Sequence, residues 1–418
     1  MDALLRADAD QIVREAIAAV LPDEAVRSAL RGMEFPGRVL LVAVGKAAWR
    51  MAKAASDCLG SRIEAGVVIT KYGHGMGQIA NFRCFEAGHP IPDENGFRAT
   101  QAALELVRGL TAEDTVLFLL SGGGSALFEE PLVSPAELQD VSAQLLACGA
   151  DIREINTIRK RLSAVKGGRF AQLCAPASVE AILLSDVLGD PPDMIGSGPA
   201  CPDSATAEDA QRIAAKYGLA LSDRARDLLE IETPKQLDNV HTQINGSVQA
   251  LCAAAADCCR RLGYEPVLLT DQLCCQAKEA GSFLASILRT HCGSGRRLAF
   301  LAGGETVVVL RGHGKGGRNQ ELALAAAEGI AGIQGAAVFS VGSDGTDGPT
   351  DAAGGYADGE TRAALEAAGL RISDVLAEND AYHALEKVGG LIVTGPTGTN
   401  VNDLSVALLR ESAQGSPE

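Results

Sequence analysis

The chain has 418 residues, enough for two or three domains with sizeable hydrophobic cores. Asp and Glu number 53 against 37 Lys and Arg, and the resulting net charge of −16 repels nucleic acid and anionic lipid. No apolar stretch approaches the ~20 residues of a membrane-spanning helix. We therefore expect a protein that binds neither nucleic acid nor membranes, and in which an anionic ligand needs a local group of cations.

The cysteine pattern bears on the cellular compartment. The eleven cysteines are an odd number, and the sequence has neither a CxxC motif nor a secretory leader. This pattern is typical of reduced thiols in a cytoplasmic protein. The sequence leaves open whether the protein is a monomer or a homodimer.

Strands alternate with helices through the first half of the chain. An amphipathic helix opens it, with Ile12, Val13, Ala16, Ile17 and Val20 on one face. Predicted strands then lie at 39–44, 66–70, 82–86, 115–120 and 181–184, with helices at about 47–55 and 103–107. Continuous apolar strands such as TVLFLL indicate burial on both faces of a parallel sheet. We expect a Rossmann-like, three-layer α/β/α domain over residues 1–235.

The second half repeats the alternation after a polar stretch near residues 230–242, where we place the domain boundary. Predicted helices lie at 247–261, 276–288 and 321–328, and predicted strands at 266–270, 298–301, 306–309, 337–341 and 403–409. Sequential parallel βα units are the natural interpretation of this order as well. We expect a smaller α/β domain over residues 245–418.

A glycine-rich basic loop, RGHGKGGRNQE at 311–321, lies between the β-branched run at 306–309 and a helical pattern. Such a loop directs backbone N–H groups and a helix N-terminus at an anion. We assign phosphate contacts to Gly316, Gly317 and Asn319, and a charge-neutralising role to Arg318. Two alternatives stay open: a flexible solvated loop, and the dinucleotide fingerprint GxGxxG with Asp344 as its acidic residue.

A second glycine loop, SGGGS, follows the strand at 115–120, at the sheet edge where α/β proteins bind ligands. Its amides and hydroxyls predict a phosphate cradle, and the alternative is a tight turn. The members of this cradle are Ser121, Gly122, Gly123, Gly124 and Ser125. Lys46 follows the strand at 39–44 and is expected at the same edge. Lys166, in the basic stretch KGGR, is a further candidate phosphate ligand.

Two acidic loops follow predicted strands. The first carries Asp186 and Asp190, whose carboxylates suit Mg²⁺ shared with substrate phosphates. The second carries Asp347 and Asp351, either of which is a candidate base for a hydroxyl group. Each loop alone is also ordinary turn chemistry. Two such loops, in a chain with two cationic glycine loops, indicate a metal–nucleotide site.

Several long motifs resemble the glycerate 2-kinases of the MOFRL family. They are GGGSAL at 122–127, NTIRKRLSAVKGGR at 156–169, SDVLGD at 185–190, GSGP at 196–199, GGRNQE at 316–321, GSDGTDGPTDAAGG at 342–355 and GPTGTNVNDL at 395–404. The resemblance covers nearly the whole chain in order. It implies a two-domain α/β enzyme that uses ATP and Mg²⁺ to phosphorylate D-glycerate to 2-phosphoglycerate, with its active site in the interdomain cleft.

The resemblance also bears on individual residues and on the alternative activity. Lys46 and Arg318 match positions considered important for activity in the family, and we assign both to positioning the γ-phosphate and the acid. Asp351 is the residue we assign as base. Members of this family have often been labelled hydroxypyruvate reductases, so an NAD(P)H-dependent reductase is the alternative prediction.

Overall fold

The computed structural model describes residues 1–79 and 81–411, and its contacts divide the chain into two units. The central unit spans Pro22–Asn245, and the terminal unit combines Met1–Leu21 with Gly246–Glu418. The predicted boundary lies close to the junction at Asn245. Residues 1–21, which the sequence analysis placed in the first domain, make their contacts with the terminal unit.

The central unit is built on a six-stranded sheet with the strand order β3-β2-β1-β4-β5-β6. Its strands are β1 (Val39–Val44), β2 (Ile63–Lys71), β3 (Phe82–Ala87), β4 (Thr115–Leu120), β5 (Ser178–Leu184) and β6 (Val240–Gly246). Strands β1 to β5 pair in parallel, and the order is that of doubly wound nucleotide-binding folds. Strand β6 was not predicted from the sequence; it lies at the end of the polar stretch assigned to the domain boundary.

Helices cover both faces of the central sheet because alternate residues of each strand point to opposite sides. Leu40, Val42 and Val44 of β1 pack against α4 (Glu94–Leu106) and α8 (Arg169–Cys174). Leu41 and Ala43 pack against α2 (Pro22–Leu30) and α3 (Ala48–Leu59) on the other face. The buried, uninterrupted apolar strands predicted from the sequence follow from this double cover.

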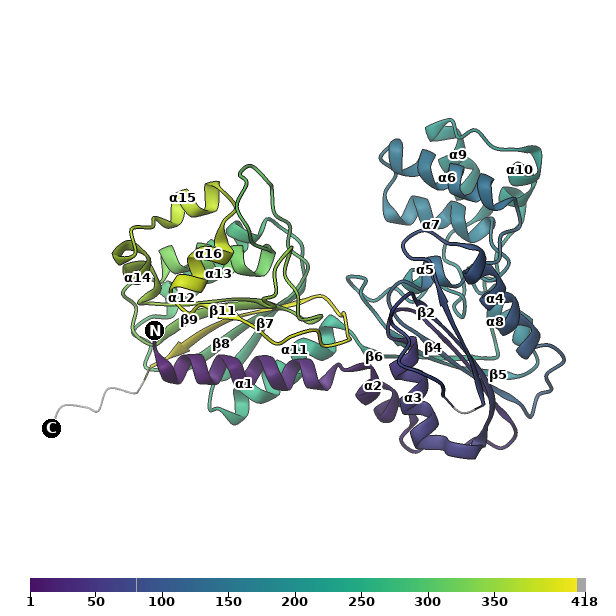
Figure 1. Ribbon diagram of the computed structural model, residues 1–418, viewed down its shortest axis with the longest axis horizontal. Helices are drawn as coiled ribbons and strands as arrows, with labels where there is room; N and C mark the ends of the chain where they lie inside the picture. The colour runs from purple at the N-terminus through teal and green to yellow at the C-terminus, as the bar shows by residue number, and fades with distance from the viewer. Residues whose placement is uncertain (80, 412–418) are drawn as a thin grey trace. The chain divides into compact units, whose positions relative to one another are not determined.

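Four further helices of the central unit form a group with its own hydrophobic core (Figure 1). They are α6 (Pro135–Ala147), α7 (Ile152–Arg161), α9 (Ala207–Tyr217) and α10 (Asp223–Glu230). Ser134, Asp151, Thr206 and Ser222 cap their N-termini by accepting backbone hydrogen bonds. Lys160 of α7 forms ion pairs with Asp193 and Asp203, so the group is tied to the segment that follows β5.

The terminal unit contains a second six-stranded sheet, ordered β11-β10-β9-β12-β8-β7. The strands are β7 (Glu265–Leu273), β8 (Arg297–Gly304), β9 (Ala336–Gly342), β10 (Gly354–Asp358), β11 (Leu391–Ile392) and β12 (Asp403–Arg410). Only β7 and β8 pair in parallel; β12 runs antiparallel between β8 and β9. The prediction of purely sequential parallel units is wrong here. The connection from β9 to β10 contains no helix, so the chain returns antiparallel.

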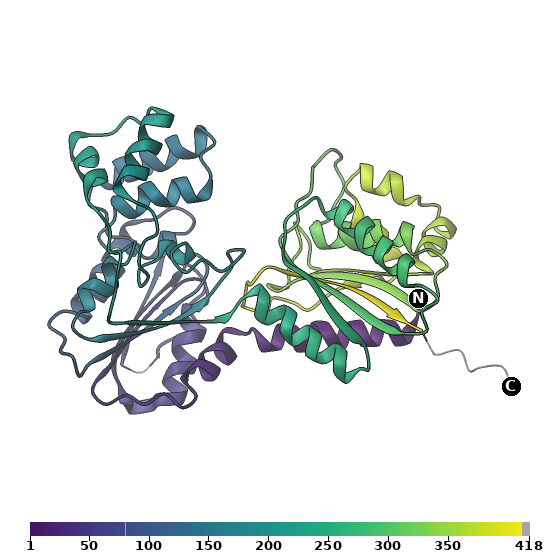
Figure 2. The same cartoon turned by 180° about the vertical axis from the view of Figure 1, so that it is seen from behind.

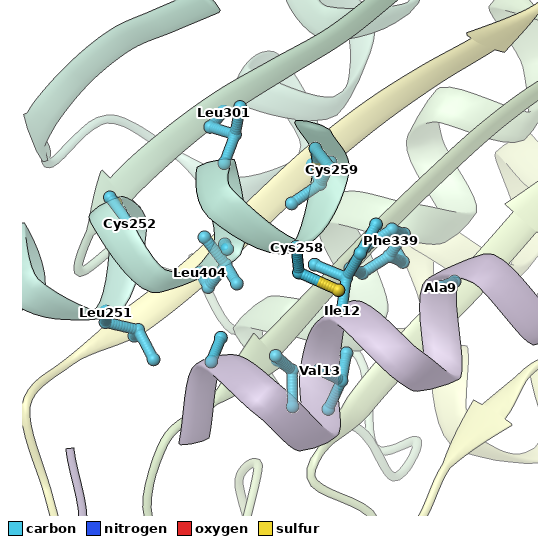
Figure 3. Close-up of a cluster of buried hydrophobic side chains, with 14 of the residues drawn as sticks. Ala9, Ile12, Val13, Leu251, Cys252, Cys258, Cys259, Leu301, Phe339 and Leu404 are labelled. Atoms are coloured by element: carbon cyan, nitrogen blue, oxygen red, sulfur yellow. The ribbon is translucent and has the colours of Figure 1, made fainter. Parts of the chain in front are cut away.

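One face of the terminal sheet is covered by two helices that are far apart in the sequence. In both views α1 (Ala3–Ala19) runs beside α11 (Val248–Arg261) (Figures 1 and 2). Ile12 of α1, Cys258 of α11 and Phe339 of β9 are fully buried in their shared core (Figure 3). The predicted apolar face of the N-terminal helix is therefore confirmed.

The other face of the terminal sheet carries α12 (Ala277–His291) and α13 (Arg318–Gly329). Three short helices, α14 (Thr361–Ala367), α15 (Ile372–Ala377) and α16 (Ala381–Lys387), pack against α13. Among the residues that the structure describes, no helix is both long and apolar enough to cross a bilayer.

Candidate active site

The predicted phosphate loop and Lys46 come together in the central unit, because β1 and β4 are neighbouring parallel strands. The backbone N–H of Lys46 donates to Gly122 O at 2.9 Å, and Ala47 N–H donates to Ser121 Oγ at 3.1 Å. The bond from Ala47 to Ser121 joins positions 74 residues apart, so two distant loops are held together at one edge of the sheet. We refer to Ser121–Ser125 as the SGGGS loop.

Each glycine of the SGGGS loop makes room for a neighbour. A Cβ atom on Gly122 would lie 2.5 Å from Asp186 Oδ2, and one on Gly124 would lie 2.5 Å from Leu120 Cδ1. Gly123 adopts φ +90°, which side chains disfavour. The helix that follows, α5 (Gly124–Leu127), is a single turn. An anion at this loop would therefore be bound by backbone amides and would gain little from a helix dipole.

A histidine that the sequence analysis did not select lies against this loop. A Cβ atom on Gly123 would meet His89 Cδ2 at 3.0 Å, His89 Nε2 at 3.2 Å and Lys46 Cγ at 3.3 Å. His74 lies next to them, with Nδ1 3.1 Å from the backbone oxygen of Lys46. Burial, together with the charges of Lys46, Lys71 and His74, lowers the pKa of His89. We call Lys46, Lys71, His74 and His89 the basic cluster.

Within the basic cluster, Lys46 and Lys71 supply the local positive charge that an anionic ligand would need in a chain of net charge −16. His89 belongs to the turn GHPIP, which follows β3. A histidine at the carboxyl end of a strand in a parallel sheet is a signal that sequence reasoning could have used.

Lys166 is buried, and its charge is matched inside the protein. Its ammonium lies 2.9 Å from Glu129 Oε2 and donates to the backbone oxygen of Phe128 at 2.6 Å. Burial lowers the pKa of Lys166, and the neighbouring Glu129 opposes this shift. To bind a phosphate directly, the ammonium would have to leave Glu129. Arg159 reaches the SGGGS loop more directly, because its guanidinium donates to Ser125 O at 3.0 Å.

The two predicted metal ligands differ in their surroundings. Asp186 lies against Gly122 of the SGGGS loop, whereas Asp190 sits in a turn with φ 50°. The described residues contain no group of three or more His, Cys, Asp or Glu side chains that could hold a metal ion. Mg²⁺ bound to substrate phosphates takes only one or two carboxylates and keeps several waters. A carboxylate directly beside a phosphate loop fits that mode of binding.

The basic glycine loop of the terminal unit has a different context from the one predicted. Strand β8 ends at Gly304, and of residues 306–309 only Val307 forms a single bridge, to Gln276. The predicted strand at 306–309 is wrong. Cβ atoms on Gly312 and Gly314 would lie 2.3 Å from Glu378 Cα and 2.4 Å from Asp380 Cβ. These glycines allow the loop to pack against residues 378–380, and the GxGxxG pattern lacks the strand immediately before it that the dinucleotide fingerprint requires.

Arg318 is the first residue of α13 and is held by two carboxylates. Its Nε and Nη2 donate to the two oxygens of Asp403 at 2.5 and 2.9 Å, and Nη1 lies 3.1 Å from Glu305 Oε1. Asp403 reaches this position because β12 lies between β8 and β9 and starts opposite the ends of both. Burial raises the pKa of Asp403 to about 6, against the opposing effect of Arg318.

Asp347 binds the N-terminus of α13. Its carboxylate accepts from Asn319 N at 3.1 Å, Gln320 N at 2.9 Å and Asn319 Nδ2 at 3.2 Å. A Cβ atom on Gly317 would lie 2.3 Å from Asp347 Cγ, so a glycine is needed for this approach. Gly316 is less confined, with Ala381 N as its nearest neighbour at 3.3 Å. The anion expected at this helix terminus is therefore present, and it is a side chain of the protein.

Asp351 also has a partner. The hydroxyl of Tyr382 donates to Asp351 Oδ1 at 2.7 Å and holds the pKa of this carboxyl below its usual value. Lys315 contributes to the same shift, and its Nζ lies 4.1 Å from the centroid of the Tyr382 ring. A carboxylate stabilised in this way is a weak proton acceptor.

Comparison with known proteins relates this arrangement to a family. A domain of unknown function, DUF4147, matches residues 8–230, and the MOFRL family matches residues 298–403. The D-glycerate 2-kinase of Thermotoga maritima is 53% identical over 96% of this chain and 97% of its own length. A putative hydroxypyruvate reductase of Agrobacterium vitis is 38% identical over 89% of this chain and all of its own.

A solved structure agrees with the sequence comparison. The crystal structure of glycerate kinase from Thermotoga maritima superposes with a TM-score of 0.93 and 52% identity, covering 97% of this chain and 99% of that one. The two sheets described above are thus shared with a glycerate kinase over essentially the full length. The chain therefore belongs to the glycerate 2-kinase family.

Proposed function

We propose that this protein transfers the γ-phosphoryl group of ATP to the 2-hydroxyl group of D-glycerate, giving ADP and 2-phospho-D-glycerate. The observation that carries the proposal is the 53% identity to a D-glycerate 2-kinase across 97% of that protein. The match spans 96% of this chain and therefore includes most of both units. The activity is that of a glycerate 2-kinase, and its nucleotide is ATP.

In the proposed reaction the central unit binds phosphoryl oxygens. Lys46 lies beside the SGGGS loop: its backbone N–H donates to Gly122 O, and its Cγ would lie 3.3 Å from a Cβ atom on Gly123. Fixed donors of this kind stabilise the charge that develops on the transferred group, and they need no reorganisation during the reaction. Burial of Lys166 against Glu129 supports an indirect role for that residue, as a support beneath the loop.

Arg318 supplies the second positive charge that the anionic acid and phosphate require. Two carboxylates fix its guanidinium, which carries five donors in a rigid plane. We propose that this fixed orientation lets the remaining donors bind a substrate oxygen. That the two units contribute to one active site in a cleft between them stays a prediction. The assignments of Gly316, Gly317 and Asn319 to phosphate binding also stay predictions, and their internal contacts with Asp347 and Ala381 do not favour them.

We further propose that Mg²⁺ is required and that Asp186, with Asp190, holds it. Mg²⁺ would neutralise the phosphate charge next to the SGGGS loop. Asp186→Asn and Asp190→Asn should each raise the Mg²⁺ concentration that gives half the maximal rate, and KM for D-glycerate should change little. Full turnover in the presence of a chelator would eliminate the metal proposal. An effect confined to KM for D-glycerate would indicate that the loop with Asp186 and Asp190 binds D-glycerate and not Mg²⁺.

The test of the function is direct. Protein incubated with Mg-ATP and D-glycerate should give the phosphorus NMR signal of 2-phosphoglycerate at the rate at which ADP appears. The reductase alternative, suggested by the name of the Agrobacterium vitis relative, predicts nicotinamide oxidation with hydroxypyruvate. The absence of a strand directly before GxGxxG argues against it. Nicotinamide turnover without formation of 2-phosphoglycerate would reverse the assignment.

A further inference from the structure

The reaction leaves open which group accepts the proton of the glycerate hydroxyl. Both carboxylates proposed from the sequence are engaged: Asp347 with the N-terminus of α13, and Asp351 with Tyr382. The partner of Asp351 makes it a poorer acceptor. The proton acceptor should therefore be one of the groups that border the SGGGS loop.

His89 borders the SGGGS loop at Gly123. The space that a Cβ atom of Gly123 would fill is bounded by the Cδ2–Nε2 edge of His89, at 3.0 and 3.2 Å, and by Lys46 Cγ at 3.3 Å. At these distances His89 and Lys46 pack against Gly123 itself and leave no room for a side chain there. An imidazole and a lysine side chain therefore both border the loop to which we assign the phosphates.

We propose that His89 is the general base of the kinase, with Nε2 accepting the proton of the glycerate 2-hydroxyl group. The inference rests on the proposed function. As the hydroxyl oxygen forms its bond to the γ-phosphorus, its proton passes to Nε2. The bond from the γ-phosphorus to the bridging oxygen breaks, and ADP leaves with the electron pair. The imidazolium then releases the proton to solvent.

The surroundings of His89 suit this role. Burial and the positive charges of Lys46, Lys71 and His74 favour the neutral imidazole, which is the form that accepts a proton. The same cations attract the carboxylate and the phosphates, so substrate binding does not place an uncompensated charge beside the base. His74 is the less suitable acceptor, because its side chain is exposed and its ring contacts the backbone oxygen of Lys46 and not the SGGGS loop.

The test compares two histidine variants in the full-length protein. His89→Gln should lower kcat by about 10²-fold, toward the small end of the range for a lost base, since phosphoryl transfer depends mainly on positioning. KM for ATP should stay within about threefold, because the phosphate ligands remain. His241→Gln is the control: His241 is exposed on β6, bonded only to Glu180, and its loss should leave kcat unchanged.

Chemical rescue distinguishes a general base at His89 from a residue with a purely structural role. Imidazoles added to His89→Gly should restore turnover in proportion to their basicity, which is expected only of a missing base. The inference is overturned if folded His89→Gln retains kcat within about fivefold, or if folded His89→Gly loses activity that no imidazole restores. In either case wild-type formation of 2-phosphoglycerate would leave the kinase assignment standing. A wild-type protein that forms none would overturn both.

Discussion

Arg318 shows how strongly the effect of a substitution depends on a residue's partners. In the sequence it is a loop arginine whose removal should hardly affect the fold. In the structure it is the bidentate partner of Asp403, whose side chain is only 6% exposed. Arg318 is 33% exposed, and Asp403 without it can take up a proton, so its loss should cost less than the ~3–5 kcal/mol of a fully buried pair. Arg318 is thus a stability residue as well as a candidate catalytic one.

We therefore predict two separable effects of Arg318→Ala. The rate with ATP and D-glycerate should fall by about 10²–10⁴-fold, since a transition-state charge contact is lost. The melting temperature should fall by several degrees, because Asp403 loses its partner. Adding Asp403→Asn should restore most of the melting temperature and none of the rate. Thermal denaturation and steady-state kinetics measure the two effects. A double variant no more stable than Arg318→Ala would contradict this view of the pair.

Asp403 should also make stability depend on pH. Its folded-state pKa of about 6 lies above the unfolded value of about 4, so the folded state holds this proton more tightly. This contribution to the free energy of unfolding is complete below about pH 4 and is lost as pH rises through about 6. Denaturant unfolding at pH 4.5 and 7 should show wild-type losing stability relative to Asp403→Asn across this interval. Parallel pH curves for the two proteins would rule the effect out.

The capping of helix α13 by Asp347 depends on one glycine. Gly317 has extended backbone angles that any residue can adopt, so its requirement is steric: a Cβ atom would lie 2.3 Å from Asp347 Cγ. Gly317→Ala should push the Asp347 carboxylate off the helix N-terminus and destabilise the protein by about 1–2 kcal/mol, the value of a lost cap. Gly316→Ala is the matched control and should cost less. Equal losses of melting temperature for the two variants would argue against the steric explanation.

The elements that sequence predicts well are those whose stability is local or uniformly apolar. The predicted strands at 39–44 and 115–120 coincide with β1 and β4, because a run of apolar residues is buried on both faces. Strand β6 was missed because its alternating polar residues are half exposed. The β-branched run at 306–309 forms no strand, since the loop containing it packs against residues 378–380 instead of pairing.

The site was predictable where it follows parallel strands and not where it depends on distant pairing. Lys46 and the SGGGS loop each follow an apolar strand, so their meeting at one sheet edge could be inferred. The pairing of Arg318 with Asp403 joins positions 85 residues apart and depends on an antiparallel strand inserted between two others. No local sequence pattern predicts that β12 is inserted between β8 and β9. The partners of Asp347 and Asp351 lie 28 and 31 positions away in the sequence, so no local pattern reveals them either.

Helix α1 belongs to the terminal unit although most of that unit lies more than 200 residues later, and this assignment can be tested. Ile12 is fully buried between α1, α11 and the terminal sheet, so Ile12→Ala should cost about 2–5 kcal/mol. Hydrogen exchange should accelerate in α11 and in β9 and stay unchanged in β1 and β4. Met51→Ala, in the core of the central unit, should give the opposite pattern. Faster exchange in β1 on substitution of Ile12 would show that the helix stabilises the other unit.

The same arrangement sets the order in which the chain can mature on the ribosome. Helix α1 emerges first, but its partner α11 begins at Val248 and the strand that completes their sheet, β12, ends at Arg410. At a synthesis rate of about 5–20 residues per second, the apolar side of α1 lacks its full set of contacts for roughly 20–80 s. The central unit is synthesised within that interval and is continuous in sequence, so it can close its core first. Newly made protein will therefore present one exposed amphipathic helix attached to a finished domain, a form that chaperones bind and proteases cut.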